Sequence, residues 1–294
     1  MKTVGEARIW LKEKLKDIYA EDELAEILFL AINFITGLSR TQLHIFAEKE
    51  LTEDQIQMLL LSAKKLQTRM PVQYALGETE FFGLKFEVNP SVLIPRPETE
   101  ELVAWVLEEK EKGERLKDER RKVDRILDIG TGSGCIPITI KKNWPEAEVF
   151  GLDISAEALE TAKKNALLNE VEVKFLHQDM LNFYPIKEAL RYSIIVSNPP
   201  YITPSEQELM HHNVLGFEPH QALFVPENDP LLFYRAVADY ASFMLENNGL
   251  LFFEINEKYG QETIVILQQK GFTEIALRKD FRGKDRMIKA TKLK

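Results

Sequence analysis

Residues 125–134 read Arg125-Ile126-Leu127-Asp128-Ile129-Gly130-Thr131-Gly132-Ser133-Gly134. An apolar strand pattern runs here into a loop with glycine at every second position, and a helical pattern follows from Ile136 to Lys142. Glycine leaves the backbone bare, and the first turn of a helix offers unpaired N–H groups to an anionic group. Strand, glycine loop and helix in this order predict the first unit of a parallel, doubly wound sheet.

The alternation of strands and helices continues beyond this unit. We expect further strands at residues 148–153, 171–176, 193–196 and 249–255, and helices at 156–168, 230–246 and 261–270. Two successive strands, 272–277 and 286–291, close the chain and indicate an antiparallel edge on a mostly parallel sheet. The predicted fold class is therefore α/β, with a Rossmann-like sheet.

The remaining segments differ from this sheet in hydrophobic pattern and composition. Residues 1–69 carry apolar side chains at helical spacing, and Thr52 with Gln55 fits a capping box, so we expect a small N-terminal helical bundle. Its role is structural or substrate-recognising, because no residue in it has the spacing of a catalytic group. Residues 70–97, rich in aromatics, glycine and proline, predict a β-hairpin linker to the domain formed by residues 98–294. Within that domain the densely charged run 108–122 is expected to be a solvated helix end or loop.

Composition limits the classes of function. The 294 residues are 45% hydrophobic, which suffices for two packed domains. A net charge of −9 disfavours a protein whose affinity comes from neutralising many phosphates, so we expect no direct nucleic-acid partner. No apolar run approaches the roughly 20 residues of a membrane-spanning helix, and the N-terminus lacks a signal core, which predicts a cytoplasmic protein without membrane contact. One cysteine, Cys135, and five histidines without ligand spacing predict no metal centre.

A second motif, Ser197-Asn198-Pro199-Pro200-Tyr201, follows the strand at 193–196. Consecutive prolines fix φ, so the side chain of Asn198 and the neighbouring carbonyl groups point in set directions, and Tyr201 adds a flat ring. Carbonyl oxygens accept hydrogen bonds and cannot donate them, so this motif suits a planar nitrogen that still carries hydrogens, an amide or a base amine. Asn-Pro alone is more often an ordinary turn, but the longer string favours a site.

Residues after the other strands predict a nucleoside pocket. Asp153 ends the second strand about twenty residues past the glycine loop, where a carboxylate can accept both ribose hydroxyls. We expect Asp179 and Met180, after the third strand, to flank an adenine. A dinucleotide fingerprint would require glycine at position 135, where this chain has Cys135, which weakens an NAD interpretation. Each feature alone is weak evidence, since a strand-end Asp is as often a helix cap.

Arg96 and Glu98 stand between prolines in Leu93-Ile94-Pro95-Arg96-Pro97-Glu98-Thr99-Glu100. Two interpretations remain open for them. Either they reach a neighbouring pocket, or they pair with one another and hold the linker in place, which as an exposed ion pair would contribute little free energy.

Together these residues resemble the class I S-adenosylmethionine-dependent methyltransferases, and specifically the PrmC/HemK family of protein-glutamine methyltransferases that act on peptide-chain release factors. The resemblance spans nearly the whole chain. One departure is Asn256, where the family commonly has glycine. The shared motifs are Pro71-Val72-Gln73-Tyr74 with Gly77, Phe81-Phe82-Gly83, Ile94-Pro95-Arg96-Pro97-Glu98-Thr99-Glu100, Asp128 to Gly134, Asn198-Pro199-Pro200-Tyr201, and Glu218-Pro219 with Ala222-Leu223.

The resemblance implies methyl transfer from S-adenosyl-L-methionine, with S-adenosyl-L-homocysteine as product and no metal. The acceptor would be the side-chain amide nitrogen (N5) of the glutamine in the Gly-Gly-Gln motif of class I release factors, and we expect a monomer. The predicted cofactor site consists of Gly130, Thr131, Gly132, Ser133, Gly134, Asp153, Asp179, Met180 and Asn198. The predicted acceptor site consists of Asn198, Pro199, Pro200 and Tyr201 with Arg96 and Glu98, and the predicted catalytic residues are Asn198, Pro199 and Tyr201.

The expected mechanism is orientation of the acceptor amide. The side-chain oxygen of Asn198 and the backbone carbonyl of Pro199 would accept the two amide hydrogens, while Tyr201 covers the amide plane. Two rival functions share parts of this pattern. An adenine-N6 DNA methyltransferase uses the same motif on a flipped-out base but needs a basic face, and a non-catalytic adaptor would only bind nucleotide through the loop.

Overall fold

The computed structural model describes residues 1–112, 123–182 and 190–293, which form two compact units. Met1–Glu78 and His211–Phe217 make up the first unit, and Thr79–Met210 and Glu218–Lys294 make up the second. The division follows Glu78, so most of the hairpin expected as a linker belongs to the second unit. The predicted charged run 108–122 lies largely outside the described residues.

The first unit is helical, as predicted for residues 1–69. Side chains of Thr3, Ser39 and Thr52 cap α1, α3 and α4, and Thr52 and Gln55 make the predicted capping box at the start of α4. A left-handed Gly37 ends α2. The apolar positions at helical spacing, among them Leu11, Leu28 and Leu59, form one buried core. The helices of this unit are α1 (Val4–Leu15), α2 (Glu21–Thr36), α3 (Arg40–Ile45), α4 (Glu53–Leu66), α5 (Val72–Leu76) and α9 (His212–Phe217).

The second unit contains a seven-stranded sheet in the order β5-β4-β3-β6-β7-β9-β8. All neighbours from β5 to β7 are parallel, and β9 is antiparallel to both β7 and β8. This confirms a mostly parallel sheet with an antiparallel edge. The strands are β3 (Arg125–Ile129), β4 (Glu148–Asp153), β5 (Lys174–His177), β6 (Tyr192–Ser197), β7 (Leu245–Glu254), β8 (Phe272–Lys279) and β9 (Asp285–Lys292).

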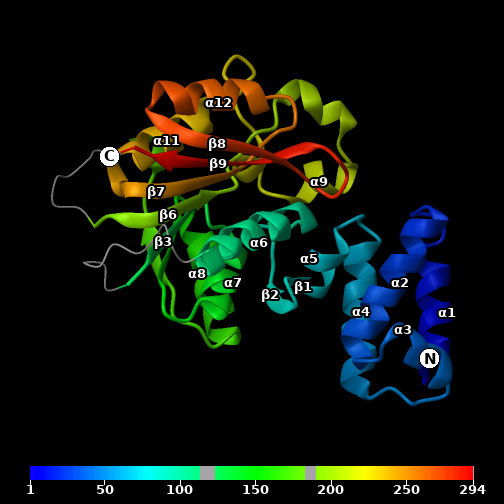
Figure 1. The fold of residues 1–294 in the computed structure, drawn as a ribbon. Coiled ribbons are helices and arrows are strands. Elements are labelled where there is room, and N and C mark those ends of the chain that lie inside the picture. The colour runs from blue at the N-terminus through cyan, green and yellow to red at the C-terminus, as the bar shows by residue number, and fades with distance from the viewer. Residues whose placement is uncertain (113–122, 183–189, 294) are drawn as a thin grey trace. The chain divides into compact units, whose positions relative to one another are not determined.

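Helices cover both faces of this sheet (Figure 1). On one face α6 (Pro97–Lys112), α7 (Cys135–Asn143) and α8 (Ala156–Leu168) share a core with inward side chains such as Ile126 and Ile194. On the other face α11 (Leu232–Met244) and α12 (Gly260–Gln269) pack on Leu127 and Ile195. Neighbouring strand residues alternate between the two cores, as expected for a sheet buried on both sides. Short helical turns η1 (Met180–Asn182), η2 (Pro204–Leu209) and α10 (His220–Leu223) follow β5 and β6.

The hairpin of β1 (Glu78–Phe81) and β2 (Leu84–Glu87) is tied to α8 by side-chain amides. Asn165, which is fully buried, accepts from Glu87 N at 2.6 Å and donates to Glu87 O at 2.9 Å. Its amide nitrogen also donates to the Ser133 carbonyl in the glycine loop at 2.9 Å. One side chain therefore connects the hairpin, a helix and the loop that borders the candidate site.

Among residues 1–112, 123–182 and 190–293, no helix combines the length and hydropathy needed to cross a lipid bilayer.

Candidate active site

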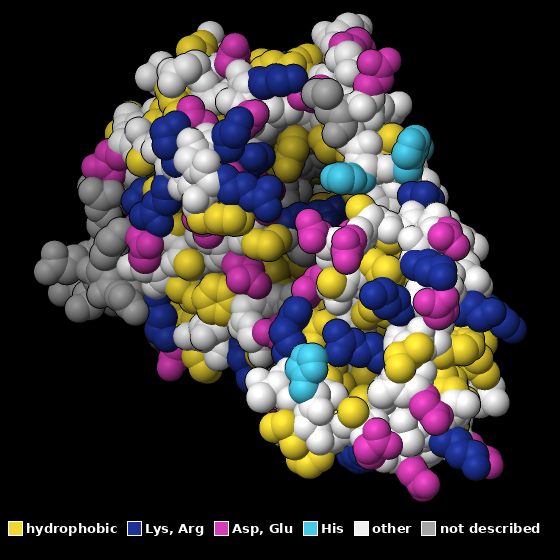
Figure 2. All heavy atoms as spheres, turned by 90° about the vertical axis from the view of Figure 1, so that its right-hand side faces the viewer, with side chains coloured by type: hydrophobic (Ala, Val, Ile, Leu, Met, Phe, Trp, Pro, Cys, Tyr) yellow, Lys and Arg dark blue, Asp and Glu magenta, His cyan; other side chains and the backbone are white. Residues whose placement is uncertain are grey.

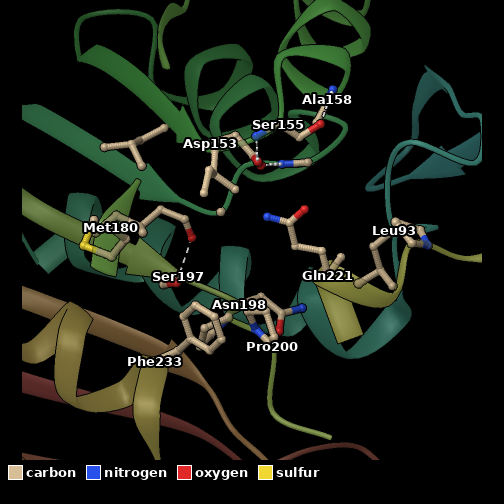
Figure 3. Close-up of a pocket in the computed structure, with 18 of the residues that line it drawn as sticks. Leu93, Asp153, Ser155, Ala158, Met180, Ser197, Asn198, Pro200, Gln221 and Phe233 are labelled. Atoms are coloured by element: carbon tan, nitrogen blue, oxygen red, sulfur yellow. Dashed lines mark hydrogen bonds between the residues drawn. The ribbon is translucent and has the colours of Figure 1, made fainter. Parts of the chain in front are cut away.

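A cavity of about 230 Å³ opens at the carboxyl ends of the central parallel strands (Figure 3). Its lining includes residues at or just after the ends of β3, β4, β5 and β6. The chain runs outward from β3 to β4 and β5 on one side and to β6 and β7 on the other, so the cavity lies where the strand order reverses. Ligands of open α/β sheets bind at such a point.

The glycine loop forms one wall of the cavity. Gly130 and Gly132 line it, and Gly132 adopts a positive φ of 53°, which favours glycine. Gly134 begins α7 where a Cβ atom would approach Ala162 Cβ of α8 to 3.1 Å, so glycine permits the close packing of these helices. Thr131 and Ser133 are buried and do not line the cavity, so their contact with a cofactor stays a prediction.

Asp153, at the end of β4, lines the cavity with a fixed carboxylate. Gly132 N donates to its Oδ2 at 2.8 Å and Ser155 N donates to its Oδ1 at 2.9 Å (Figure 3). Burial raises the pKa of Asp153, and these backbone donors oppose that shift. Each oxygen keeps a second lone pair, so the carboxylate can still accept hydroxyl groups from a ligand.

Asp179 and Met180, after β5, both line the cavity as well. The oxygens of Asp179 accept from Leu181 N at 2.8 Å and from Asn182 Nδ2 at 2.6 Å, which holds the turn η1 in place. Met180 is 8% exposed and presents an apolar surface. The structure thus brings both residues to the same cavity as Asp153.

Asn198, Pro199 and Pro200 line the side of the cavity formed by the end of β6. In the view of Figure 3, Asn198 and Pro200 lie across the cavity from Asp153. Asn198 Nδ2 donates to Thr99 Oγ1 at 3.3 Å, whereas Asn198 Oδ1 accepts no hydrogen bond from the described residues. An acceptor with a free lone pair is therefore available at the predicted position.

Tyr201 lies outside the cavity lining. Its hydroxyl donates to Glu254 Oε1 at 3.3 Å, and burial raises its pKa far above the ordinary range for a phenol. Its ring packs against the core shared with α11. Asn256, the departure from the family pattern, donates from Nδ2 to the Tyr201 carbonyl at 3.3 Å. The prediction that this ring covers an acceptor amide stays a prediction.

Arg96 and Glu98 do not line the cavity either. The guanidinium of Arg96 pairs with the carboxylate of Glu218, whose other oxygen accepts from Ile94 N at 3.2 Å. Glu98 Oε1 lies 3.6 Å from Arg282 Nε. Arg96 thus forms an Arg–Glu pair that holds the linker, with Glu218 as its partner and not Glu98, and the contact of Arg96 and Glu98 with substrate stays a prediction.

Several lining residues were not predicted from the sequence. Leu93, Gln178, Gln221 and Phe233 border the cavity, and in Figure 3 the side chain of Gln221 reaches into it. Gln221 stands inside the shared motif Glu218-Pro219 to Ala222-Leu223, which was the available signal; Phe233 had none, because a helix interior gives no sign of a ligand. Within the described ranges, no group of three or more His, Cys, Asp or Glu side chains is placed to hold a metal ion.

Comparisons with known proteins agree with this arrangement. The family model "Methyltransferase small domain" matches residues 114–217, and "PrmC N-terminal domain" matches residues 6–77. A release factor glutamine methyltransferase from Flavobacterium psychrophilum is 46% identical over 279 residues, which cover 94% of this chain and 95% of the relative. Another from Bacteroides thetaiotaomicron is 40% identical over 283 residues, covering 96% and 98%.

Among solved structures, the hMettl16 catalytic domain, crystallised with an RNA hairpin, matches with a TM-score of 0.53. It covers 82% of each chain at 15% identity, so this likeness concerns the fold alone. The sheet order and the cavity at the carboxyl ends of the strands agree with relatives that are at least 40% identical over nearly the full length. This chain therefore belongs to the release factor glutamine methyltransferase family.

Proposed function

We propose that this chain transfers a methyl group from S-adenosyl-L-methionine to the side-chain amide nitrogen (N5) of the glutamine in the Gly-Gly-Gln motif of class I peptide-chain release factors. The observation that carries the proposal is that Asn198 and Pro199 border the same cavity as Gly132 and Asp153. The motif suited to an amide group and the residues suited to a nucleoside thus line the same cavity, in a chain of the release factor glutamine methyltransferase family.

The residues beside the glycine loop fit this cofactor. Asp153 offers a fixed carboxylate for a ribose diol, and Gly130 and Gly132 leave bare backbone for the rest of the ligand. Both oxygens of Asp128 and the hydroxyl oxygen of Thr131 are buried, without a hydrogen-bond partner among the described residues. A buried carboxyl group without a donor, just before the glycine loop, complements a ligand that carries positive charge, as S-adenosyl-L-methionine does.

When bound, S-adenosyl-L-methionine supplies a methyl group on a sulfonium that is already activated for displacement. Gly130, Gly132, Asp153, Asp179 and Met180 would hold it, and we propose that Thr131, Ser133, Gly134 and Asn198 support the same site. These residues bind and orient, and none of them has to act as a general base, because the N-protonated product amide is acidic enough to lose its extra proton to solvent.

The chemical difficulty lies in the acceptor. An amide nitrogen is a poor nucleophile, because its lone pair is delocalised into the carbonyl group. We propose that Asn198 Oδ1 and the Pro199 carbonyl oxygen accept the two amide hydrogens and so direct the nitrogen lone pair at the methyl group. Placement of this kind can supply roughly 7 to 11 kcal/mol of the barrier in favourable cases. Pro200 would keep the backbone rigid, and Tyr201 would cover the amide plane.

The remaining parts of the proposal concern partners. We propose that residues 1–69 recognise the release factor, and that Arg96 and Glu98 contribute to the acceptor side. The chain would act as a cytoplasmic monomer, without a metal, a nucleic acid or a membrane. On the face that Figure 2 presents, Lys and Arg side chains lie among Asp and Glu side chains. Ion pairs such as Arg278–Glu108 engage basic side chains of the second unit. A face of mixed sign gives little support to a DNA substrate.

The test is methyl transfer from labelled S-adenosyl-L-methionine to a purified release factor. The matched control is the same release factor with the Gly-Gly-Gln glutamine replaced by asparagine, and further reactions contain adenine-rich DNA or the cofactor alone. We expect label only on the intact release factor, at the glutamine. Label on DNA would favour the adenine methyltransferase, and cofactor binding without transfer to any acceptor would favour the adaptor; either result overturns the proposal.

A further inference from the structure

Hydrogen bonds lead from Asn198 into the interior of the second unit. Asn198 Nδ2 donates to Thr99 Oγ1 at 3.3 Å, and Thr99 Oγ1 donates to Glu254 Oε2 at 2.6 Å. The other oxygen of Glu254 accepts from the Tyr201 hydroxyl at 3.3 Å. Thr99 and Glu254 are 3% and 2% exposed. The side chains of these four residues, of which Asn198 lines the cavity, therefore form one connected and largely buried hydrogen-bond network.

The fold brings these side chains together for a simple reason. Ser197 of β6 pairs in register with Phe253 of β7, so the residues that follow them, Asn198 and Glu254, end adjacent parallel strands. Thr99 stands in the first turn of α6, which packs on β7 and its neighbours. The position of the network thus follows from sheet register and from one helix start.

The proton count in the network determines how the Asn198 carboxamide is turned. A hydroxyl group has a single proton. When Thr99 gives that proton to Glu254, its oxygen can only accept, and its other partner must be an N–H donor. The Asn198 nitrogen therefore faces Thr99, and its oxygen is directed elsewhere. In the reverse orientation two acceptor oxygens would face each other without a proton between them.

Glu254 is placed to accept the hydrogen bonds at the end of this network. Thr99 and Tyr201 both donate to it, and the positive charge of Arg286 lies near enough to favour its ionised form. Burial raises the pKa of Glu254, and the Thr99 hydrogen bond and Arg286 oppose that shift. Arg286 makes its ion pair with Asp280, at 3.1 Å. The two hydrogen bonds that Glu254 accepts among the described residues come from the hydroxyl groups of Thr99 and Tyr201.

We propose that Thr99 and Glu254 are positioning residues that hold the Asn198 carboxamide with its oxygen free for the hydrogen of an acceptor amide. This inference rests on the proposed function, because it names what orients the group that would orient the substrate. It assigns Thr99 a role that Arg96 and Glu98, its neighbours in the same motif, do not share, because Arg96 pairs with Glu218 and Glu98 lies 3.6 Å from Arg282.

The first test compares Thr99→Val with Thr99→Ser, because serine restores the hydroxyl and valine keeps the shape. We expect Thr99→Val to lower kcat by about tenfold, the kinetic equivalent of one hydrogen bond, with KM for the release factor and affinity for S-adenosyl-L-homocysteine nearly unchanged. Thr99→Ser should recover most of kcat. Thr139→Val is the matched control, since Thr139 is also a buried threonine but has no hydrogen-bond partner for its hydroxyl among the described residues.

A second variant keeps the test decisive if Thr99→Val does not fold. Glu254→Leu keeps a side chain of similar volume, and Arg286, the nearby cation, keeps its ion pair with Asp280. Glu254→Leu frees the Thr99 proton to bond with Asn198 Oδ1, which turns the amide. We expect a loss of kcat of about the same size as in Thr99→Val, although Thr99 and Asn198 are both intact. Wild-type turnover in Glu254→Leu would overturn the proposal.

A double-mutant cycle separates positioning from general damage. In the Asn198→Ala background the network has nothing left to orient, so adding Thr99→Val should change kcat by less than about twofold. If Thr99→Val costs the same factor in both backgrounds, it acts independently of Asn198 and the proposal fails.

A readout without turnover distinguishes failure of this inference from failure of the proposed function. The side-chain amide signal of Asn198 can be identified in nitrogen-15 spectra by its loss in Asn198→Ala. We expect slow hydrogen exchange of one of its two hydrogens in the wild type and in Thr99→Ser, and fast exchange in Thr99→Val. Equal exchange in all three contradicts the positioning role even if the enzyme is active. Absence of methyl transfer by the wild type contradicts the proposed function, while the exchange rates still decide the role of Thr99.

Discussion

Asp128 shows how much a single side chain can depart from its ordinary chemistry in this fold. It is the penultimate residue of β3, just before the glycine loop, is fully buried, and neither of its oxygens has a hydrogen-bond partner among the described residues. Burial raises the pKa of Asp128 to about 7, the nearby Thr131 hydroxyl opposes this shift, and the negative charge of Asp153 adds to it. A group of this kind costs stability in the unliganded chain, which is typical of binding sites.

The first prediction concerns this residue and pH. Because the folded-state pKa of Asp128 lies above its unfolded value of about 3.9, the folded chain binds more protons than the unfolded chain between these values. The contribution of Asp128 to the free energy of unfolding therefore falls as pH rises from about 4 to about 7. Asp128→Asn removes this contribution, so the variant should gain stability over the wild type by on the order of 2 kcal/mol between pH 5 and pH 8.

Urea denaturation of both proteins without cofactor at the two pH values provides the measurement. Thr139→Val serves as the control, because it removes an unpaired buried oxygen that does not titrate, and any gain from it should be the same at both pH values. A stability difference between wild type and Asp128→Asn that does not change with pH would show that Asp128 titrates normally.

The sequence could predict those site residues that lie at or just after the ends of strands. Asn198, Asp153 and Gly132 follow strand ends, and a parallel sheet gathers strand ends at one edge, so their meeting required no knowledge of distant contacts. Side chains whose partner lies far along the chain were beyond prediction. Arg96 pairs with Glu218, a residue 122 positions away, and Tyr201 turns from the cavity to Glu254. Both outcomes depend on long-range packing that a local pattern does not encode.

At the scale of elements, local pattern located the strands and helices but not every bound, and it did not give the strand order; the strand expected at 171–176 is β5, Lys174–His177. The strands at 125–129 and 148–153 and the helix at 156–168 have the predicted limits. The predicted strand at 249–255 begins earlier, at Leu245, because that segment also pairs with Tyr192 of β6. The insertion of β9 between β7 and β8 could not be read from alternation, since the choice of a neighbour is made by cores on both faces of the sheet.

The element-scale prediction concerns Asn165, which ties the hairpin and the glycine loop to α8. Asn165→Ala leaves Glu87 N and the carbonyls of Glu87 and Ser133 without these partners. We expect a loss of about 2 to 3 kcal/mol in the free energy of unfolding, from unsatisfied buried groups. Because the loop loses its tie, affinity for S-adenosyl-L-homocysteine should fall as well.

Chemical denaturation and titration calorimetry measure the two effects. Asn143→Ala is the control, since among the described residues the side chain of the exposed Asn143 donates only to the Thr139 carbonyl within its own helix, so its loss should change neither quantity appreciably. If Asn165→Ala matches this control in stability, the hairpin is held by its apolar contacts alone.

At the scale of the whole molecule, the residues that line the cavity belong to the second unit. Both units expose large apolar side chains, and those of the first unit include Ile9, Ile45 and Leu61, at 67%, 68% and 59% exposure. Exposed apolar groups on a small bundle are suited to contact with a protein. This supports the proposal that the first unit recognises the release factor.

The corresponding prediction is that Leu61→Asp raises KM for the release factor by about tenfold or more, while kcat and affinity for S-adenosyl-L-homocysteine stay near the wild type. Leu167→Asp in the second unit is the control, because Leu167 is 79% exposed but belongs to α8. Steady-state kinetics over a range of release factor concentrations give both constants. Unchanged KM in Leu61→Asp would remove that face of the bundle from substrate recognition.

The central claim is that a rigid pair of acceptors at Asn198 and Pro199 orients the glutamine amide. Its most direct test is kcat of Asn198→Ala with a release factor at saturating S-adenosyl-L-methionine, compared with Asp153→Ala, which should chiefly weaken cofactor binding. We predict that Asn198→Ala lowers kcat by at least about a hundredfold, the size seen when an oriented hydrogen-bonding group is removed from a transition state, with cofactor affinity changed only modestly. Turnover equal to the wild type in Asn198→Ala would contradict the account.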